Sequence, residues 1–361
     1  MERTLASIQK IIAINPIEGA DKIELVDVLG WHVVCKKGEF KVGEKVVYCE
    51  IDSIMPEKPE FEFLRSRGFK IKTMKLNKFN VISQGIIFPL SIIDFSKCAH
   101  DFCFGEGVDV TEIIGVVKKE DEMLEKDEES KNPIIKYLMR FKIFRNLLLN
   151  NKLRNGRGFP RFISKTDETR IQNLSVVYNS SYAGTDGWSI SEKIDGQSVT
   201  YFSTSRGFIF GRKFGVCSRN LHLKNECPGS WWEVAKRCNI KEKLEKVPFN
   251  VAIQGEILGS AIQNNKYKVA INQLFIFNVK NLDTNTYLTN TEIVEFCNTY
   301  DFRSVPYISF NETLPTTIDE LVQYSKGKSK LRDVLREGIV VRKGNISFKV
   351  INPDFLLKHE E

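Results

Sequence analysis

The stretch Ser191–Ser198, with the sequence SEKIDGQS, is polar and lies between two segments rich in strand-forming residues. Gly187–Ile190 precedes it and Val199–Phe202 follows it. We expect one strand to end at Lys193 and the chain to turn at Asp195–Gly196 into the next strand, because Asp-Gly pairs favour tight turns. A plain hairpin explains the pattern as well as a functional lysine does, since Lys-x-Asp-Gly is a short motif. The rest of the chain therefore decides what the lysine does.

The composition is that of a globular protein large enough for two domains. The chain has 361 residues, of which 42% are hydrophobic and 27% charged, and it carries a net charge of +7. Neither an apolar leader at the N-terminus nor an apolar run near the roughly 20 residues of a membrane span is present. We expect an intracellular, cytoplasmic protein that does not enter a membrane. The eight cysteines form no CxxC pair and are expected to be reduced.

Residues 1–116 read as short strands separated by turns. Gly30, Gly38 and Gly43 separate the early runs, and this spacing favours a small β-barrel, for which we choose an oligonucleotide-binding (OB) barrel. A β domain without a ligand is the alternative, because architecture alone does not imply binding. The strand-forming runs are Ile23–Val28, Trp31–Cys35, Lys45–Ile51 and Gly85–Leu90.

Four closely spaced lysines favour the binding interpretation of this domain. They lie two or three residues apart, and such a set would line one strand face and follow a phosphate backbone. A solvated edge that discourages aggregation explains them equally well. The four are Lys70, Lys72, Lys75 and Lys78.

Residues 117–158 are expected to connect two domains. Lys118–Lys131 contains seven acidic and four basic residues, and only Met123 and Leu124 are apolar, which predicts a linker. Residues 133–157 follow, and their apolar side chains recur at helical spacing. Between Pro133 and Arg161 there are eight Lys or Arg residues and no acid. A brace packed on one domain, a nucleic-acid contact and a membrane-surface helix all remain open for this segment.

Residues 159–361 repeat one pattern, in which a polar residue lies at the end of an apolar strand. Because alternate side chains of a strand share a face, such a polar residue points into a cleft while its neighbours build the core. We therefore expect an α+β domain of antiparallel sheets flanked by helices, with a nucleotide pocket. The segments are Gly211–Asn220, Val251–Ile257, Leu274–Val279, Arg336–Arg342 and Ser347–Ile351.

These parts permit nucleotidyl transfer through a covalent lysine adduct. A lysine with the ordinary pKa of about 10.4 attacks phosphorus only after nearby positive charge has made its proton easier to lose. Lys349 and a divalent metal would supply that charge at Lys193. Asp195, Glu256 and Glu337 are the hard oxygen donors that Mg²⁺ or Mn²⁺ prefers. Phe275 and Phe277 lie two residues apart, so both would face a bound purine.

At these residues the chain resembles the covalent nucleotidyltransferase superfamily, which includes polynucleotide ligases and messenger RNA capping enzymes. Lys193–Gly196 (KIDG) is similar to its nucleophile motif. Ser218–Asn220 resembles the RNA-ligase element that follows the nucleophile, and Phe159–Asn173 resembles the lead-in of ligases whose OB domain is N-terminal. The chain ends soon after Lys349, without room for the C-terminal OB domain of DNA ligases and capping enzymes. The resemblance is thus to an ATP-dependent RNA ligase.

The resemblance implies a role for each of these residues. Lys193 would be the adenylylated nucleophile, with Lys349 as the second catalytic lysine. It further implies sealing of 3′-OH and 5′-phosphate ends through lysyl-AMP and an adenylylated 5′ end, in nicked duplexes with RNA on the 3′-OH side. The enzyme would act as a monomer on nucleic acid. Adenylate contacts are implied for Lys193, Arg219, Glu256, Phe277 and Lys349, and metal contacts for Asp195, Glu256 and Glu337.

Two departures from the family pattern leave questions open. A single lysine, Lys349, stands where many relatives have two, so Lys358 or Arg342 would assist the leaving pyrophosphate. Asn278 replaces an acid that often follows the stacking aromatic. A catalytically silent nucleic-acid binder and a GTP-dependent guanylyltransferase are the alternative functions.

Overall fold

The structure is a computed structural model that describes residues 3–94, 104–118, 156–205, 211–224 and 229–359. The contacts divide the chain into two compact units. Of the described residues, the N-terminal unit comprises 3–94, 104–118, 171–181 and 356–359, and the C-terminal unit comprises 156–170, 182–205, 211–224 and 229–355. Most of the expected linker and basic helix at 117–158 lies outside the described residues. The described part of the chain contains no helix long and apolar enough to cross a membrane.

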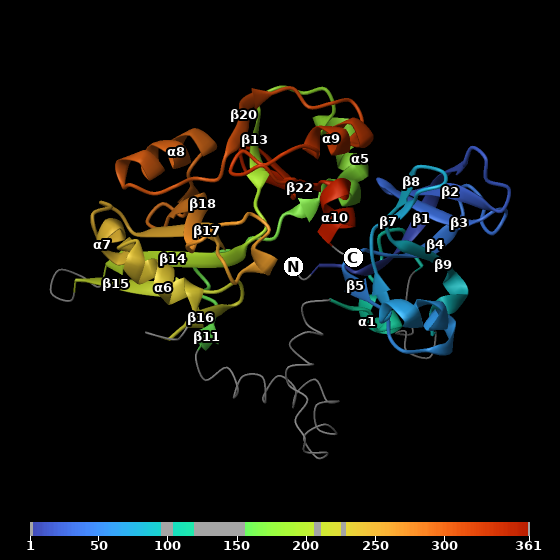
Figure 1. Ribbon diagram of the computed structural model, residues 1–361, viewed down its shortest axis with the longest axis horizontal. Helices are drawn as coiled ribbons and strands as arrows, with labels where there is room; N and C mark the ends of the chain where they lie inside the picture. The colour runs from blue at the N-terminus through green and yellow to red at the C-terminus, as the bar shows by residue number, and fades with distance from the viewer. Residues whose placement is uncertain (1–2, 95–103, 119–155, 206–210, 225–228, 360–361) are drawn as a thin grey trace, which may run out of the picture. The chain divides into compact units, whose positions relative to one another are not determined.

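The N-terminal unit is built on a five-stranded antiparallel sheet of order β3-β2-β1-β4-β9 (Figure 1). Its long strand β1 pairs with β2 on one side and β4 on the other, and its register shifts between Ile11 and Ala13. Such a bulge bends a strand, which allows one strand to serve two halves of a curved sheet. The four expected strand runs are all present. The bounds are β1 Ala6–Pro16, β2 Ile23–Val28, β3 Trp31–Lys36, β4 Lys45–Cys49 and β9 Ile86–Pro89.

Shorter elements complete this unit, and they correct the expectation that the four lysines share a strand face. Lys70 lies in β6, Lys72 follows it, Lys75 lies in β7 and Lys78 in the next turn. The chain leaves β6 after two residues, so no single strand carries all four. The remaining bounds are β5 Ser53–Ile54, η1 Pro59–Arg67, β6 Lys70–Ile71, β7 Met74–Leu76, β8 Val81–Ser83, η2 Leu90–Ile92, α1 Thr111–Ile114 and β10 Val117–Lys118.

Residues 171–181, although distant in sequence, pack as part of the N-terminal unit. The Trp31 indole Nε1 donates to Asn173 Oδ1 at 2.7 Å, and Asn173 Nδ2 donates to Glu50 Oε1 at 2.5 Å. Tyr178 is fully buried. The helical turns here are η4 Ile171–Leu174, α5 Ser175–Val177 and η5 Tyr178–Tyr182.

The C-terminal unit contains a seven-stranded sheet, β11-β16-β15-β14-β17-β18-β19, and a five-stranded sheet, β12-β22-β21-β13-β20. Every strand pair is antiparallel except β12 with β22. The bounds are β11 Gly156–Gly158, β12 Thr169–Arg170, β13 Trp188–Lys193, β14 Gln197–Ser205, β15 Arg212–Cys217, β16 Leu221–Leu223, β17 Val251–Leu258, β18 Gln273–Asn281, β19 Thr286–Tyr287, β20 Tyr307–Glu312, β21 Gly338–Lys343 and β22 Ile346–Ile351.

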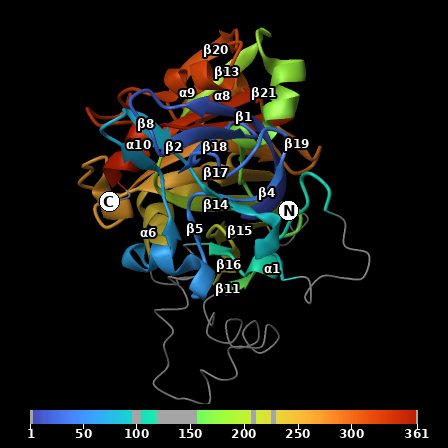
Figure 2. The ribbon, with the colours of Figure 1, turned by 90° about the vertical axis from the view of Figure 1, so that its right-hand side faces the viewer.

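Helices α6, α7 and α8 lie along the seven-stranded sheet (Figure 1), and Figure 2 shows its strands from β18 at the top through β17, β14, β15 and β16 to β11. Apolar residues of α6, α7 and α8 pack with Val199, Tyr201 and Ile253 in a buried core. A capping box begins α8, where Thr289 Oγ1 accepts from Glu292 N and Glu292 Oε2 accepts from Thr289 N. The helix bounds are α6 Ser230–Arg237, α7 Ile240–Glu245, η6 Gln263–Asn265, α8 Asn290–Thr299, α9 Ile318–Ser325 and α10 Pro353–His359.

The polar stretch after β13 joins the two sheets of the C-terminal unit. β13 ends at Lys193 and β14 begins at Gln197, as expected, but the two strands do not pair as a hairpin. β13 pairs with β20 and β21, whereas β14 pairs with β15 and β17. Position 196 accommodates only a glycine without strain, because a Cβ there would lie 2.7 Å from the Ile257 carbonyl oxygen. The crossing puts Lys193 where the sheets meet.

Candidate active site

Lys193 lies opposite Gly338 in the pairing of β13 with β21, so Glu337 reaches the lysine side chain. Lys193 Nζ donates to Glu337 Oε1 at 2.6 Å. Gly338 also permits the close approach of β21 and β22, because a Cβ there would lie 2.2 Å from the Val350 carbonyl oxygen. Two residues that the sequence predicts for one site, 144 positions apart, therefore form an ion pair.

The carboxylates around Lys193 hold it in the charged form. Burial acts to lower the pKa of the lysine, but the nearby negative charges outweigh it and leave the pKa above its ordinary value. Glu337 contributes most, followed by Asp195 and Glu256. In the free protein Lys193 is thus an ammonium group, and an added positive charge is needed to release its proton.

Glu256 and Glu337 each have a carboxylate oxygen that is available to bind a cation. The two Oε2 atoms are buried and have no hydrogen-bond partner among the described residues. Burial raises the pKa of Glu256 to about 8, and the Glu337 carboxylate adds to this rise. Burial also raises the pKa of Glu337. Unpaired buried oxygens of this kind are costly unless an ion or water satisfies them, so they fit a divalent metal.

The three predicted metal residues do not form a direct ligand cage. Within the described ranges, no three His, Cys, Asp or Glu side chains are placed to hold an ion together. Mg²⁺ commonly keeps several waters and contacts protein through them. The arrangement of Asp195, Glu256 and Glu337 therefore fits water-mediated contact with a metal.

Asp195 has partners that the sequence did not indicate. Its Oδ2 pairs with Lys266 Nζ, and its backbone N–H donates to the Tyr267 hydroxyl oxygen at 3.2 Å. Tyr267 is buried, whereas the Asp195 and Lys266 side chains are each 17% exposed. These partners hold the carboxylate beside the lysine. The contact between Lys266 and Asp195 spans 71 positions, so no local sequence pattern indicates it.

Lys349 and Arg219 are brought together by an acid that we did not predict as a site residue. Lys349 lies on β22, and its Nζ donates to Asp167 Oδ1 at 3.1 Å. Arg219 follows β15, and its Nη2 donates to Asp167 Oδ2 at 3.2 Å. Asp167 therefore bridges two cations to which the resemblance assigns contacts with the adenylate.

Phe277 lies at a bulge, and Phe275 is more deeply buried. The pairing of β17 with β18 shifts register between Gln254 and Gly255, next to Phe277. Phe275 is 5% exposed, whereas Phe277 is half-buried. Phe277 is therefore the better placed of the two to meet a purine.

Arg342 supports this region and is not free to assist a leaving group. It donates to the Phe277 carbonyl oxygen at 2.7 Å, to Asn278 Oδ1 at 2.6 Å and to Glu168 Oε1 at 2.9 Å. Glu168 thus supplies a carboxylate beside Asn278, where the family pattern has an acid. Lys358, the other residue considered for that assistance, belongs to the N-terminal unit.

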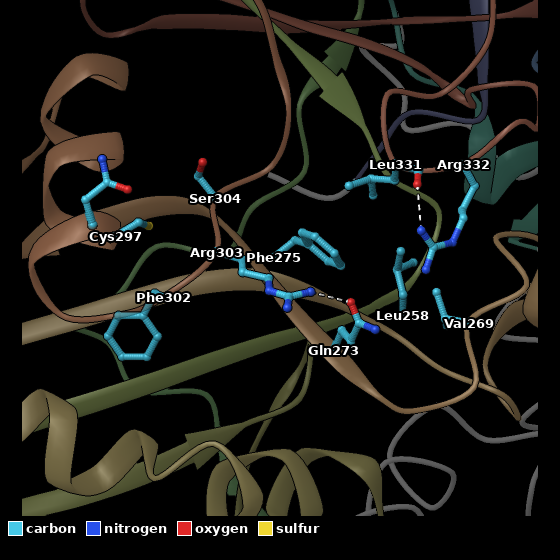
Figure 3. A pocket seen from close by; sticks show the side chains of 11 residues that line it. Leu258, Val269, Gln273, Phe275, Cys297, Phe302, Arg303, Ser304, Leu331 and Arg332 are labelled. Atoms are coloured by element: carbon cyan, nitrogen blue, oxygen red, sulfur yellow. Dashed lines mark hydrogen bonds between the residues drawn. The ribbon is translucent and has the colours of Figure 1, made fainter.

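A cavity of about 570 Å³ lies beyond Phe275, between the edge of the seven-stranded sheet and the loop at Leu331–Arg332 (Figure 3). Arg303 crosses it and donates to Gln273 Oε1 at 2.8 Å. None of the predicted catalytic or metal residues lines it. The predicted catalytic residue Lys193 lies instead at the junction of the two sheets, beside Glu337.

Comparisons with known proteins found a family model for part of each unit. An OB-fold domain model matches residues 5–90, and an RNA ligase family model matches residues 186–351. No curated protein sequence matches the chain. Among solved structures, the Naegleria gruberi RNA ligase with pyrophosphate is 31% identical, with 99% of each chain covered and a TM-score of 0.80. The chain belongs to the RNA ligase family.

Other structures of the same Naegleria ligase carry ligands of the expected kind. One variant with ATP and Mn is 30% identical over 99% of this chain and 100% of that chain, with a TM-score of 0.79. A variant with AMP and Mn is 29% identical over 99% of both chains, with a TM-score of 0.78. A lysine and an aspartate two positions apart were each replaced in further variants. That spacing is also the spacing of Lys193 and Asp195.

Proposed function

We propose that this RNA ligase uses ATP to seal a 3′-OH to a 5′-phosphate through a lysyl-AMP intermediate on Lys193. The observation that carries the proposal is the contact of Lys193 Nζ with Glu337 Oε1 at 2.6 Å, at the junction of two sheets and among three carboxylates. The ATP, AMP and Mn bound by the Naegleria ligase support the choice of cosubstrate and metal.

The first step forms a phosphoramidate. Lys193 Nζ, after losing a proton to solvent, attacks the α-phosphorus of ATP, so that a P–N bond forms and the bond to pyrophosphate breaks. A divalent metal near Glu256 and Glu337 would offset the negative charge around the lysine and on the phosphates. Lys349 and Arg219 would bind phosphate oxygens, and Phe277 would contact the base.

The second step transfers the AMP from Lys193 to the RNA, and the third step releases it. An oxygen of the RNA 5′-phosphate attacks the phosphorus of lysyl-AMP, and the P–N bond breaks to return Lys193. The 3′-OH then attacks the activated 5′-phosphate, a phosphodiester forms and AMP leaves. We expect nicked duplexes with RNA on the 3′-OH side as substrates, a monomeric enzyme and a cytoplasmic location.

Self-labelling tests this proposal. Protein stripped of nucleotide with pyrophosphate is incubated with α-labelled ATP and Mg²⁺, and the band is followed on a denaturing gel before and after acid. We expect an acid-labile label in the wild type and none in Lys193→Ala, because the substitution removes the proposed nucleophile. Lys241→Ala removes an exposed lysine that pairs with Glu245 on α7 and serves as the matched control.

Three outcomes would contradict the proposal. Full labelling of Lys193→Ala would show that the nucleophile is wrong. Absence of an adduct with ATP, GTP or NAD would favour a silent nucleic-acid binder, and preferential labelling by GTP would favour a guanylyltransferase. Once the adduct is established, nicked duplexes with RNA or DNA 3′ ends identify the strand that is sealed.

A further inference from the structure

Asp167 occupies a position that suits a phosphate better than a carboxylate. Its two oxygens each accept from a different cation, Lys349 Nζ at 3.1 Å and Arg219 Nη2 at 3.2 Å. Lysine and arginine converging on two oxygens of one anion form a typical phosphate-binding arrangement. The proposed function already assigns these two cations to the nucleotide, so Asp167 and a nucleotide phosphate need the same partners.

The backbone on either side of Asp167 is fixed. Gln254 Nε2 donates to the Ser164 carbonyl oxygen at 2.9 Å, and Glu168 pairs with Arg342 at 2.9 Å. Ile163 is buried in a core cluster, and Thr169 begins β12. The carboxyl group therefore remains close to the two cations even when its side chain rotates.

The exposure of the three side chains shows which of them can move. Lys349 is 13% exposed, whereas Asp167 is 36% and Arg219 is 41% exposed. Asp167 has a solvent-facing side, and ion pairs of such exposure are worth only about 0–1 kcal/mol. A phosphate group with more negative charge can therefore displace the carboxylate, while Lys349, the least exposed of the three side chains, stays in place.

We propose that Asp167 is an internal competitor for the phosphate subsite of Lys349 and Arg219, and this rests on the proposed function. In the free enzyme the carboxylate holds both cations in their binding positions. On ATP binding it rotates toward solvent and yields them to the phosphates. When the nucleotide has left, the carboxylate returns to both cations.

Pyrophosphate binding to the full chain tests this inference without catalysis. Inorganic pyrophosphate is titrated into nucleotide-stripped protein by calorimetry, for the wild type, Asp167→Asn and Asp167→Glu. We expect Asp167→Asn to bind pyrophosphate about three- to tenfold more tightly, because the competing charge is gone. Asp167→Glu keeps the charge and should bind as the wild type does. Asp301→Asn removes an acid paired with Lys243 elsewhere and should leave the affinity unchanged.

Each other outcome overturns the inference. Unchanged affinity of Asp167→Asn would show that the carboxylate does not compete, and weaker binding restored by Asp167→Glu would show a supporting role only. If neither the wild type nor Asp167→Asn binds pyrophosphate, Lys349 and Arg219 do not form a phosphate subsite. The self-labelling of Lys193 is a separate readout, so failure of either proposal is recognised independently. Asp167→Ser provides a second neutral variant if Asp167→Asn is unstable.

Discussion

Glu256 is a buried carboxyl group whose charge the free protein disfavours. Burial raises its pKa from 4.5 to about 8. The folded chain therefore binds this proton more tightly than the unfolded chain does. The resulting stability is fully present below about pH 4.5 and is lost as the pH rises toward and through about 8.

We expect Glu256→Gln to stabilise the protein in alkaline solution. Glutamine has nearly the same shape and no charge to bury, so the melting temperature at about pH 8.5 should exceed that of the wild type by about 2–5 °C and the difference should shrink near pH 5. Thermal unfolding across this pH range measures the effect. Adding Mg²⁺ at about pH 8.5 should stabilise the wild type more than Glu256→Gln, because the metal offsets the buried charge.

The parallel control is Glu295→Gln, which removes an exposed acid on α8. Its melting temperature should follow that of the wild type at every pH. If Glu256→Gln behaves in the same way, the carboxyl group of Glu256 titrates normally and the site does not bury its charge.

Arg342 on β21 ties three segments of the C-terminal unit together. Its guanidinium group binds the β18 backbone at Phe277, the Asn278 side chain and Glu168 before β12. The Arg342 and Glu168 side chains are 14% and 16% exposed, so loss of either leaves the other largely buried without its charge partner. A contact of this kind stabilises an arrangement of strands and not one strand alone.

We expect Arg342→Met to lower the free energy of unfolding of this unit by about 2 kcal/mol, since methionine fills the space without replacing the hydrogen bonds. Denaturant unfolding with a fluorescence readout checks this. Arg237→Met removes an exposed arginine paired with Glu233 on α6 and should change stability by less than about 0.5 kcal/mol. Equal effects of the two substitutions would contradict the structural role of Arg342.

The sequence predicted the strands well where the signal is local. The end of β13 at Lys193 and the start of β14 at Gln197 follow from the Asp-Gly turn. The contact of Lys193 with Glu337 spans 144 positions, and the roles of these site residues stay a prediction. The alternative of a plain hairpin was wrong because pairing depends on which strands lie nearby in space, and β13 pairs with β20 and β21.

The supporting contacts of the site were not predictable for a related reason. Lys266 pairs with Asp195 across 71 positions, and Asp167 with Lys349 across 182. Neither acid–base pair has a fixed spacing or a periodic pattern, so only the folded chain reveals it. Such long-range pairs fix the geometry of a site whose residue types the motifs already supply.

At the scale of the whole molecule, the chain passes between its two units more than once. Residues 171–181 leave the C-terminal unit after β12 and pack in the N-terminal unit, and the chain then returns at Tyr182. Asn173 is central to this packing, because its amide accepts from the buried Trp31 indole and donates to Glu50. Glu50 also pairs with Arg3 at 2.6 Å.

We expect Asn173→Ala to loosen residues 171–177 without unfolding the C-terminal unit. The substitution leaves the Trp31 N–H without this partner and removes one donor to Glu50, at a cost of about 2 kcal/mol. Hydrogen exchange of the full chain should then show faster exchange at the backbone amides of Ile171–Val177, while β17 and β18 keep their protection. Asn311→Ala, which changes an exposed residue on β20, should leave both regions as in the wild type. Unchanged exchange at 171–177 in Asn173→Ala would mean that this segment is held by other contacts, and that the division of the chain falls elsewhere.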